Sequence, residues 1–220
     1  MDMEKKESKS IEVIERAFHM FGPDQAIAFT GGKDSLTVLH MVKRVCGGRI
    51  TVPVINIDTT VKFEEIYAFR DAIASEWALD LIVLTNQDAV GIEIARDKKE
   101  CCYKLKVSVL NNAIEKYKFK AILTGIRWDE QAERSTEEYF SERQGPGHTR
   151  VNPVLHFTEA DIWEYIKKYD LPYCGLYDEG YRSLGCKPCT FKGPDIRNER
   201  DGRSRDKEEQ MKDLRLLGYF

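Results

Sequence analysis

Short apolar runs alternate with longer amphipathic segments along the first 125 residues of the chain. The short runs end at turn-forming residues, which is typical of buried strands, and the run over residues 51–57 is rich in β-branched residues. The longer segments repeat their apolar positions with a helical period. The pattern predicts strands over residues 25–29, 51–57, 80–84 and 120–124, and helices over residues 8–21, 35–46, 63–78 and 104–117.

Strands that alternate with helices predict a parallel sheet covered on both faces, an α/β, doubly wound fold of Rossmann type. Ligands bind such sheets beyond the carboxyl ends of the strands. Polar groups follow three of the predicted strands, at residues 30–35, 58–60 and 125–127. Their convergence predicts a nucleotide site at this edge of the sheet.

The segment from Thr30 to Ser35 joins the first predicted strand to its helix and contains Gly31 and Gly32. Glycines allow a sharp turn and the close approach of a ligand. Asp34 or Ser35 is expected to cap the helix, whose exposed amides form an anion site beside the charge of Lys33. The spacing does not fit a Walker loop. A tight structural turn is the alternative interpretation.

The chain changes character after Arg127. Residues 128–147 are polar, and arginines, including Arg134, alternate with acidic residues. This stretch is expected to be either a solvated helix and loop or a mobile arm whose arginines close on phosphates. Thr158 is expected to cap a helix that extends to about residue 168. An irregular and helical extension follows.

Composition limits the class of protein. The 220 residues are 42% hydrophobic, enough for one domain with an extension. No apolar run is long enough to span a membrane, and the charged start predicts a cytoplasmic protein. The net charge of −3 gives no overall nucleic-acid footprint. The basic stretches 127–150 and 192–205 are either phosphate-backbone contacts or ordinary solvated faces.

Four of the six cysteines form two close pairs, Cys101 with Cys102 and Cys186 with Cys189. In an intracellular protein, paired cysteines indicate metal or redox chemistry more often than disulfides. Cys46 and Cys174 are expected to be packing residues.

With these residues laid out, the chain resembles the phosphoadenosine phosphosulfate reductase family of the adenine-nucleotide α-hydrolase superfamily. The Gly31–Ser35 segment is similar to the pyrophosphate-binding loop (PP-loop) of ATP pyrophosphatases, with Thr30 in place of a serine. The resemblance implies an N-terminal helix over residues 1–24, a nucleotide-binding domain over 25–155 and a C-terminal extension over 156–220.

Different parts resemble different members of the family. The 58–71 segment and the 199–220 ending are similar to the small subunit of sulfate adenylyltransferase. The cysteine pairs resemble the adenylyl-sulfate reductases in which four cysteines hold a 4Fe–4S cluster. A cubane cluster needs four thiolates, which two pairs can supply. Zinc also accepts four cysteines, and inert cysteines are the third alternative.

Two departures decide the expected function. The reductases act through a cysteine in a C-terminal tail, but no cysteine follows Cys189 in this chain. The reductases also have a degenerate glycine loop, whereas the Gly31–Ser35 loop is intact. The resemblance therefore implies an enzyme that cleaves ATP at the α phosphate, releases pyrophosphate and activates an acceptor for sulfur incorporation.

Each site residue then has an expected role. Lys33 and Ser35 hold the pyrophosphate, Asp34 binds Mg²⁺, and Arg127 and Arg134 orient the acceptor or the α phosphate. Asp58 and Thr59 lie near the sugar or the metal. The complete expected nucleotide-binding set is Ala28, Phe29, Thr30, Gly31, Gly32, Lys33, Asp34, Ser35, Asp58, Thr59 and Gly125.

The acceptor is either sulfate or a group on DNA or tRNA, and the cluster suits nucleic-acid thiolation better. The expected partners are a sulfur-donor protein or a GTPase subunit, a nucleic-acid substrate and a second copy of the chain. Two alternatives stay open. One is a reductase of adenylyl sulfate or its phosphorylated form that uses an external thiol, and the other is a non-catalytic nucleotide-binding subunit. Cys174 could replace the missing tail cysteine only if its loop reached the substrate.

Overall fold

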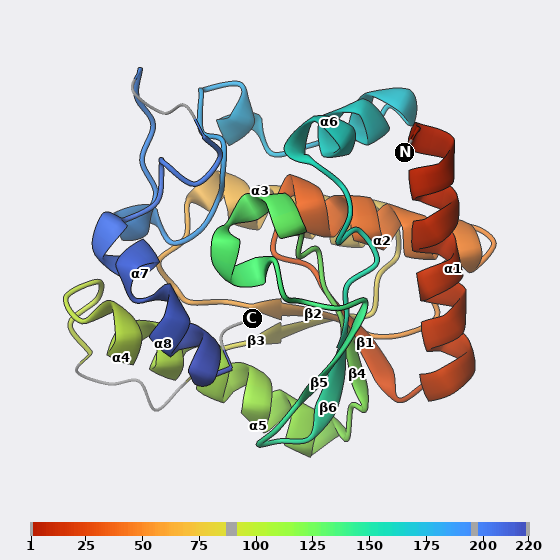
Figure 1. Ribbon diagram of the computed structural model, residues 1–220, viewed down its shortest axis with the longest axis horizontal. Coiled ribbons are helices and arrows are strands. Elements are labelled where there is room, and N and C mark those ends of the chain that lie inside the picture. Colours follow the sequence, from red (N-terminus) through yellow and green to blue (C-terminus); the bar gives the residue numbers. More distant parts are fainter. Residues whose placement is uncertain (1, 87–91, 195–197, 219–220) are drawn as a thin grey trace.

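The computed structural model describes residues 2–86, 92–194 and 198–218. Its sheet has six strands in the order β3-β2-β1-β4-β6-β5 (Figure 1). All neighbouring strands are parallel except the edge pair β5 and β6. The strands are β1 Gln25–Ala28, β2 Val54–Ile57, β3 Leu81–Leu84, β4 Ala121–Leu123, β5 Phe140–Arg143 and β6 His148–Val151. The predicted doubly wound, mainly parallel α/β fold is confirmed.

Alternate side chains of the central strands enter two separate cores, as the period of a strand requires. Ile27 and Val54 pack with helices α1, α2 and α6 on one face, whereas Ala26 and Ile55 pack with α5 on the other. Figure 1 shows α2 and α5 on opposite sides of the sheet. The helices are α1 Met3–Phe21, α2 Lys33–Val45, α3 Glu64–Glu76, α4 Lys98–Cys102, α5 Ser108–Tyr117, α6 Glu159–Lys168, α7 Arg205–Glu209 and α8 Met211–Leu216.

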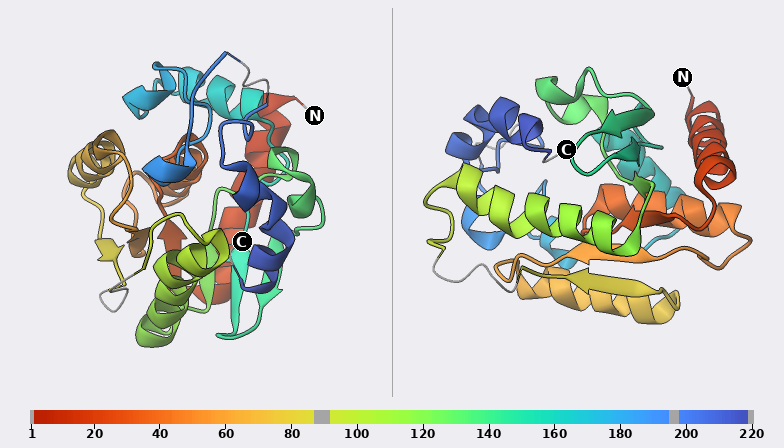
Figure 2. Two further views of the ribbon diagram at one scale, coloured as in Figure 1. Left: turned by 90° about the vertical axis from the view of Figure 1, so that its left-hand side faces the viewer. Right: turned by 90° about the horizontal axis from the view of Figure 1, so that it is seen from below.

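The helix predicted over residues 104–117 is one part of a longer helical segment. A π-helical turn, Tyr103–Val107, joins α4 to α5. The C-terminal helices α7 and α8 contact α4 at one end of the molecule, and α1 lies at the opposite end (Figure 2). Among the described residues, no helix has the length and apolarity that crossing a membrane requires.

The helix predicted within residues 128–147 was wrong, whereas the expected action of its arginines on phosphates stays a prediction. Two short 3-10 turns, Trp128–Glu130 and Ala132–Arg134, precede the β5–β6 hairpin. Strand β6 pairs with β4, and its polar residues His148 and Arg150 are buried by the rest of the chain. The strand therefore depends on tertiary cover, and its own sequence has no apolar run.

Helix caps were predicted with mixed success. Thr158 caps α6 as expected, and its hydroxyl accepts a hydrogen bond from the Asp161 amide at 3.3 Å. Neither Asp34 nor Ser35 caps α2. That helix begins at Lys33, after Gly32, so both side chains lie within its first turn.

Candidate functional site

The glycine loop connects β1 to α2, as the sequence predicts. Gly31 has a φ of +84°, and a Cβ at this position would lie 2.8 Å from Cγ2 of Ile66. Both facts restrict the position to glycine. Three loop amides donate to side-chain oxygens of the protein: Thr30 N to Ser35 Oγ at 3.1 Å, Gly32 N to Thr30 Oγ1 at 3.3 Å, and Lys33 N to the Tyr177 hydroxyl at 3.0 Å. These three amides, which the sequence predicted to be exposed, are thus paired with oxygens of the loop and of Tyr177.

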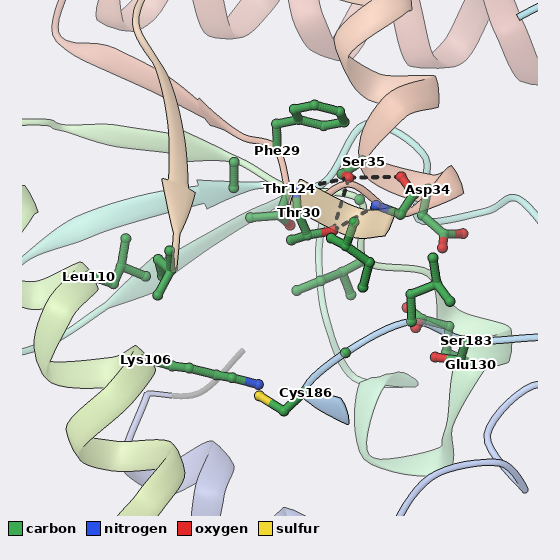
Figure 3. Close-up of a pocket in the computed structure, with 18 of the residues that line it drawn as sticks. Phe29, Thr30, Asp34, Ser35, Lys106, Leu110, Thr124, Glu130, Ser183 and Cys186 are labelled. Carbon is green, nitrogen blue, oxygen red and sulfur yellow. Dashed lines mark hydrogen bonds between the residues drawn. The ribbon is translucent and has the colours of Figure 1, made fainter. Parts of the chain in front are cut away.

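A cavity of about 290 Å³ lies beyond the carboxyl ends of the central strands (Figure 3). One wall is apolar and comes from Ala28, Ile55, Ile57, Leu110 and Ile122. The glycine loop forms another wall through Thr30, Gly32, Asp34 and Ser35. An apolar wall beside polar groups suits a nucleobase attached to a charged group.

Among the described residues, six basic side chains line the same cavity, and they come from segments distant in sequence: Lys62, Lys106, Arg134, Arg150, Arg200 and Arg203. Only Arg134 was predicted as an individual site residue. Burial, together with the charges of Arg143 and Arg134, lowers the pKa of Arg150 to about 9, against the opposite effect of Glu137. An anion in the cavity would offset this repulsion. The cavity is therefore suited to a negatively charged ligand.

Lys33 and Arg127 lie in a buried ion network beside the loop. Arg127 Nε is 2.6 Å from Asp34 Oδ1, and Lys33 Nζ is 3.3 Å from Asp34 Oδ2. Glu199 pairs with both cations, and Asp129 pairs with Arg127. The described residues that line the cavity do not include Lys33 or Arg127. The two predicted phosphate-binding cations are thus paired with carboxylates.

The network shifts the pKa values of its members. Burial raises the pKa of the Asp34 carboxyl, but Lys33 and Arg127 lower it by more, so that the pKa lies below its usual range. Burial and the neighbouring charge of Asp34 raise the pKa of Glu199 above its usual value, even though Lys33 and Arg127 oppose the shift. Two carboxylates that share the same cations therefore differ in their affinity for a proton.

Asp58 and Thr59 are held behind the cavity wall. Asp58 Oδ1 accepts hydrogen bonds from the Tyr67 hydroxyl at 2.8 Å and from the Thr60 amide at 2.7 Å. Thr59 is fully buried, with its Oγ1 3.2 Å from Cys186 Sγ. Neither is among the described residues that line the cavity. Phe29 and Gly125, also predicted, do line it.

The four paired cysteines surround a second, smaller cavity. Cys101 and Cys102 end α4, next to the π-helical turn, and Cys186 and Cys189 come from the C-terminal extension. The Lys187 amide donates to Val61 O at 2.8 Å, which fixes the extension against the loop after β2. Figure 3 shows Cys186 and Lys106 pointing toward one another. Both residues line both cavities, so the two cavities share a wall.

Four basic side chains surround these thiols: Lys98, Lys106, Arg203 and Lys207. Burial raises the pKa of the Cys186 thiol, but Lys106, the hydrogen bond with Thr59, Lys207 and Arg203 lower it to about 7. Four thiols with compensating cations fit the donor set of an iron–sulfur cluster or of zinc. Within the described residues, no group of three or more His, Cys, Asp or Glu side chains is arranged to hold a metal ion.

The other two cysteines lie elsewhere. Cys174 is buried in an apolar cluster with Phe63, Ile66 and Leu176. Cys46 follows α2, with its Sγ 3.9 Å from Thr51 Oγ1. Their surroundings agree with the packing roles expected for them.

Residues 24–192 match the family model for the phosphoadenosine phosphosulfate reductase domain. The chain belongs to this family. It is 34% identical over 202 residues to sulfate adenylyltransferase subunit 2 of Methylorubrum extorquens strain PA1, an alignment that covers 80% of this chain. The chain spans 65% of that relative's length. It is 27% identical over 201 residues to adenosine 5′-phosphosulfate reductase of Oceanobacillus iheyensis, covering 87% of this chain and 82% of the relative.

Solved structures agree on the fold. Phosphoadenylyl-sulfate reductase from Candida auris superposes with a TM-score of 0.71 at 22% identity, covering 82% of this chain and 89% of that one. FMN adenylyltransferase from Candida glabrata with ATP gives 0.72 at 18% identity, covering 98% and 80%. The predicted family is confirmed, and so is the mixture of adenylyltransferase and reductase features among its relatives.

Proposed function

We propose that the protein is an ATP pyrophosphatase of sulfur metabolism that transfers the adenylyl group of ATP to an acceptor. The observation that carries the proposal is the intact glycine loop, which lines a cavity that also has an apolar wall and six basic side chains. The similarity to sulfate adenylyltransferase subunit 2 supports the same chemistry.

In this proposal the adenine lies against Ala28, Ile55 and Leu110, and the phosphates lie toward the loop and the basic side chains. An acceptor oxygen attacks the α phosphorus in line, the bond from that phosphorus to the bridging oxygen breaks, and pyrophosphate leaves with its negative charge. Lys33 and Ser35 stabilise the leaving group, and Arg134, at the cavity, orients the α phosphate. Positioning supplies most of the rate enhancement.

Two residues have roles that follow from their pairing. Asp34 lines the cavity as an ionised carboxylate, which fits a Mg²⁺ ligand. Arg127 is fully buried and holds Asp34 through a 2.6 Å ion pair. Arg127 therefore positions Asp34. This role comes in addition to the one predicted from the sequence, which is to orient the acceptor or the α phosphate.

Cys101, Cys102, Cys186 and Cys189 would hold a 4Fe–4S cluster, with zinc as the less favoured occupant. A cluster held by these four residues would supply sulfur-handling chemistry. The proposed acceptor is a nucleic-acid group activated for sulfur insertion or, as the adenylyltransferase relatives suggest, sulfate with the help of a partner subunit. A second candidate, favoured by the four-cysteine cavity and the Oceanobacillus relative, is an adenylyl-sulfate reductase that uses an external thiol.

The test is anaerobic purification followed by measurement of iron, the visible spectrum, and pyrophosphate release from ATP with Mg²⁺. We expect a brown protein with about four irons per chain. Replacing any of the four paired cysteines by Ala should lower the iron content, whereas Cys46→Ala should not. Pyrophosphate release should fall in Asp34→Asn.

Sulfate, DNA and tRNA are then added in turn to identify the acceptor. A protein that never cleaves ATP but releases sulfite from adenylyl sulfate would establish the reductase instead. A colourless protein with zinc would remove the cluster and leave the nucleotide site unaffected. Nucleotide binding without turnover of either substrate would indicate a non-catalytic subunit.

A further inference from the structure

Glu199 connects the two cations of the buried network. Its Oε1 pairs with Lys33 Nζ and its Oε2 with the Arg127 guanidinium. The side chains of both cations are fully buried, and that of Glu199 is 8% exposed. Glu199 comes from the C-terminal extension, 166 positions after Lys33. A distant carboxylate has therefore been placed at the start of α2, beside the glycine loop.

One anion with two oxygens, each paired with a cation, has the arrangement of a bound phosphate group. The network holds two positive charges, on Lys33 and Arg127, against three carboxylates, on Asp34, Asp129 and Glu199. Within the part of the chain that the structure describes, it therefore has no excess positive charge to attract a further anion. Phosphates that reach Lys33 must displace a carboxylate or bring a metal cation.

The main cavity differs from this network. The described residues that line the cavity include neither cation and not Glu199, whereas six other basic side chains face it. Two carboxylates, Asp34 and Glu130, are the acidic side chains among these described lining residues, so basic side chains outnumber them. Arg134 and Arg200 are themselves paired with Glu130 and Glu208. The excess of positive charge can still bind a single phosphate while Glu199 keeps its partners. A ligand with a pyrophosphate group extends toward the loop, where the Glu199 carboxylate is already ion-paired with Lys33.

We propose that Glu199 is a specificity-determining residue that competes with the β and γ phosphates of ATP for Lys33 and Arg127. ATP and free pyrophosphate must break the two ion pairs of Glu199 in order to bind, whereas a nucleoside monophosphate binds without breaking them. This proposal rests on the proposed ATP-cleaving function. Its consequence is that the carboxylate weakens the binding of the leaving group and so favours pyrophosphate release.

The competition predicts how replacing Glu199 changes binding. Glu199→Gln leaves two positive and two negative charges in the network, so no uncompensated cation is buried and the fold is retained. Glu199→Asp keeps the negative charge, but the side chain is one methylene shorter, so the carboxylate lies farther from Lys33 and Arg127. The matched control is Glu179→Gln, which removes a half-exposed carboxylate of the same extension, paired with Lys192 at 2.9 Å.

The experiment is equilibrium titration of the unmodified protein and these variants with AMP, pyrophosphate and Mg²⁺–ATP, after thermal unfolding has shown that each variant is folded. In Glu199→Gln we expect about tenfold tighter binding of pyrophosphate and ATP, and AMP affinity within about twofold of the unmodified protein. Glu199→Asp should give a smaller gain, and Glu179→Gln none.

Unchanged or weaker pyrophosphate binding in Glu199→Gln would overturn the proposal, as would an equal gain for AMP, which would indicate a general electrostatic effect. The proposal would also be contradicted if pyrophosphate bound neither to the unmodified protein nor to Glu199→Gln. Binding needs no turnover, so the two proposals can fail separately. The expected affinity changes in a protein that never cleaves ATP would reject only the proposed function, and cleavage without those changes would reject only the role of Glu199.

Discussion

Gly125 leaves no room for a side chain where the end of β4 meets the start of α2. A Cβ at this position would lie 2.8 Å from both the carbonyl carbon of Asp34 and the amide nitrogen of Ser35. Those atoms belong to the backbone of a helix, so they cannot move aside as a flexible side chain would. The close contact fixes the glycine loop relative to the sheet and thereby sets the position of Asp34 in the cavity.

Gly125→Ala should therefore destabilise the fold and weaken nucleotide binding together. We expect a loss of about 1–3 kcal/mol in the free energy of unfolding, the usual cost of overpacking, measured by urea denaturation. AMP affinity, measured by titration, should fall because the loop is displaced. Gly175→Ala is the control, since a Cβ there meets nothing within 4 Å. Equal effects of the two substitutions would show that the contact with α2 is unimportant.

At the scale of elements, Glu7 joins helix α1 to α2 and to the end of α6. Its carboxylate accepts from Arg44 at 3.0 Å and from Lys168 and the Tyr169 hydroxyl at 2.6 Å each. Burial raises the pKa of Glu7, but these three hydrogen bonds lower it by more, and the pKa lies below its usual value of 4.5. The ionised form thus stabilises the packing of the N-terminal helix on the domain.

Glu7→Gln should cost about 2 kcal/mol near neutral pH, the scale of hydrogen bonds to a charged group. Because the pKa of Glu7 is lowered in the folded state, this contribution is complete above pH 4.5 and is lost as the pH falls through the lowered pKa. The difference between the two proteins in urea denaturation should accordingly shrink in acid. Glu15→Gln, at an exposed position of the same helix, should have little effect at any pH. A difference that does not depend on pH would contradict this explanation.

At the scale of the whole molecule, helix α8 attaches the end of the described chain to the sheet. Leu214 and Met211 are buried with Cys102, Ile126 and Leu155, which come from three distant segments. Arg150 also donates to Gly218 O at 2.6 Å. The same C-terminal region supplies Arg200 and Arg203 to the cavity. The cavity is therefore complete only when this region is docked.

Leu214→Ala should cost about 2–5 kcal/mol in the free energy of unfolding, as for other buried leucines. AMP binding should weaken as well, since the basic residues of the extension lose their support. Leu216→Ala, two positions away and 87% exposed, should change stability by less than about 0.5 kcal/mol. Urea denaturation and AMP titration test both variants. If Leu214→Ala leaves AMP affinity intact, the docking of α8 is not needed for the cavity.

The amino-acid sequence by itself determined the parallel sheet, the glycine loop and the family. These features depend on local patterns: short apolar runs form β1 and β4, a β-branched run forms β2, and Gly31 supplies a backbone conformation that other residues rarely adopt. Only the tertiary structure decided that the polar β5–β6 hairpin joins the sheet and that Glu199 pairs with Lys33 and Arg127. The physical reason is that burial of a charged side chain is stabilised by partners far along the chain, and such partners leave no periodic pattern in the sequence.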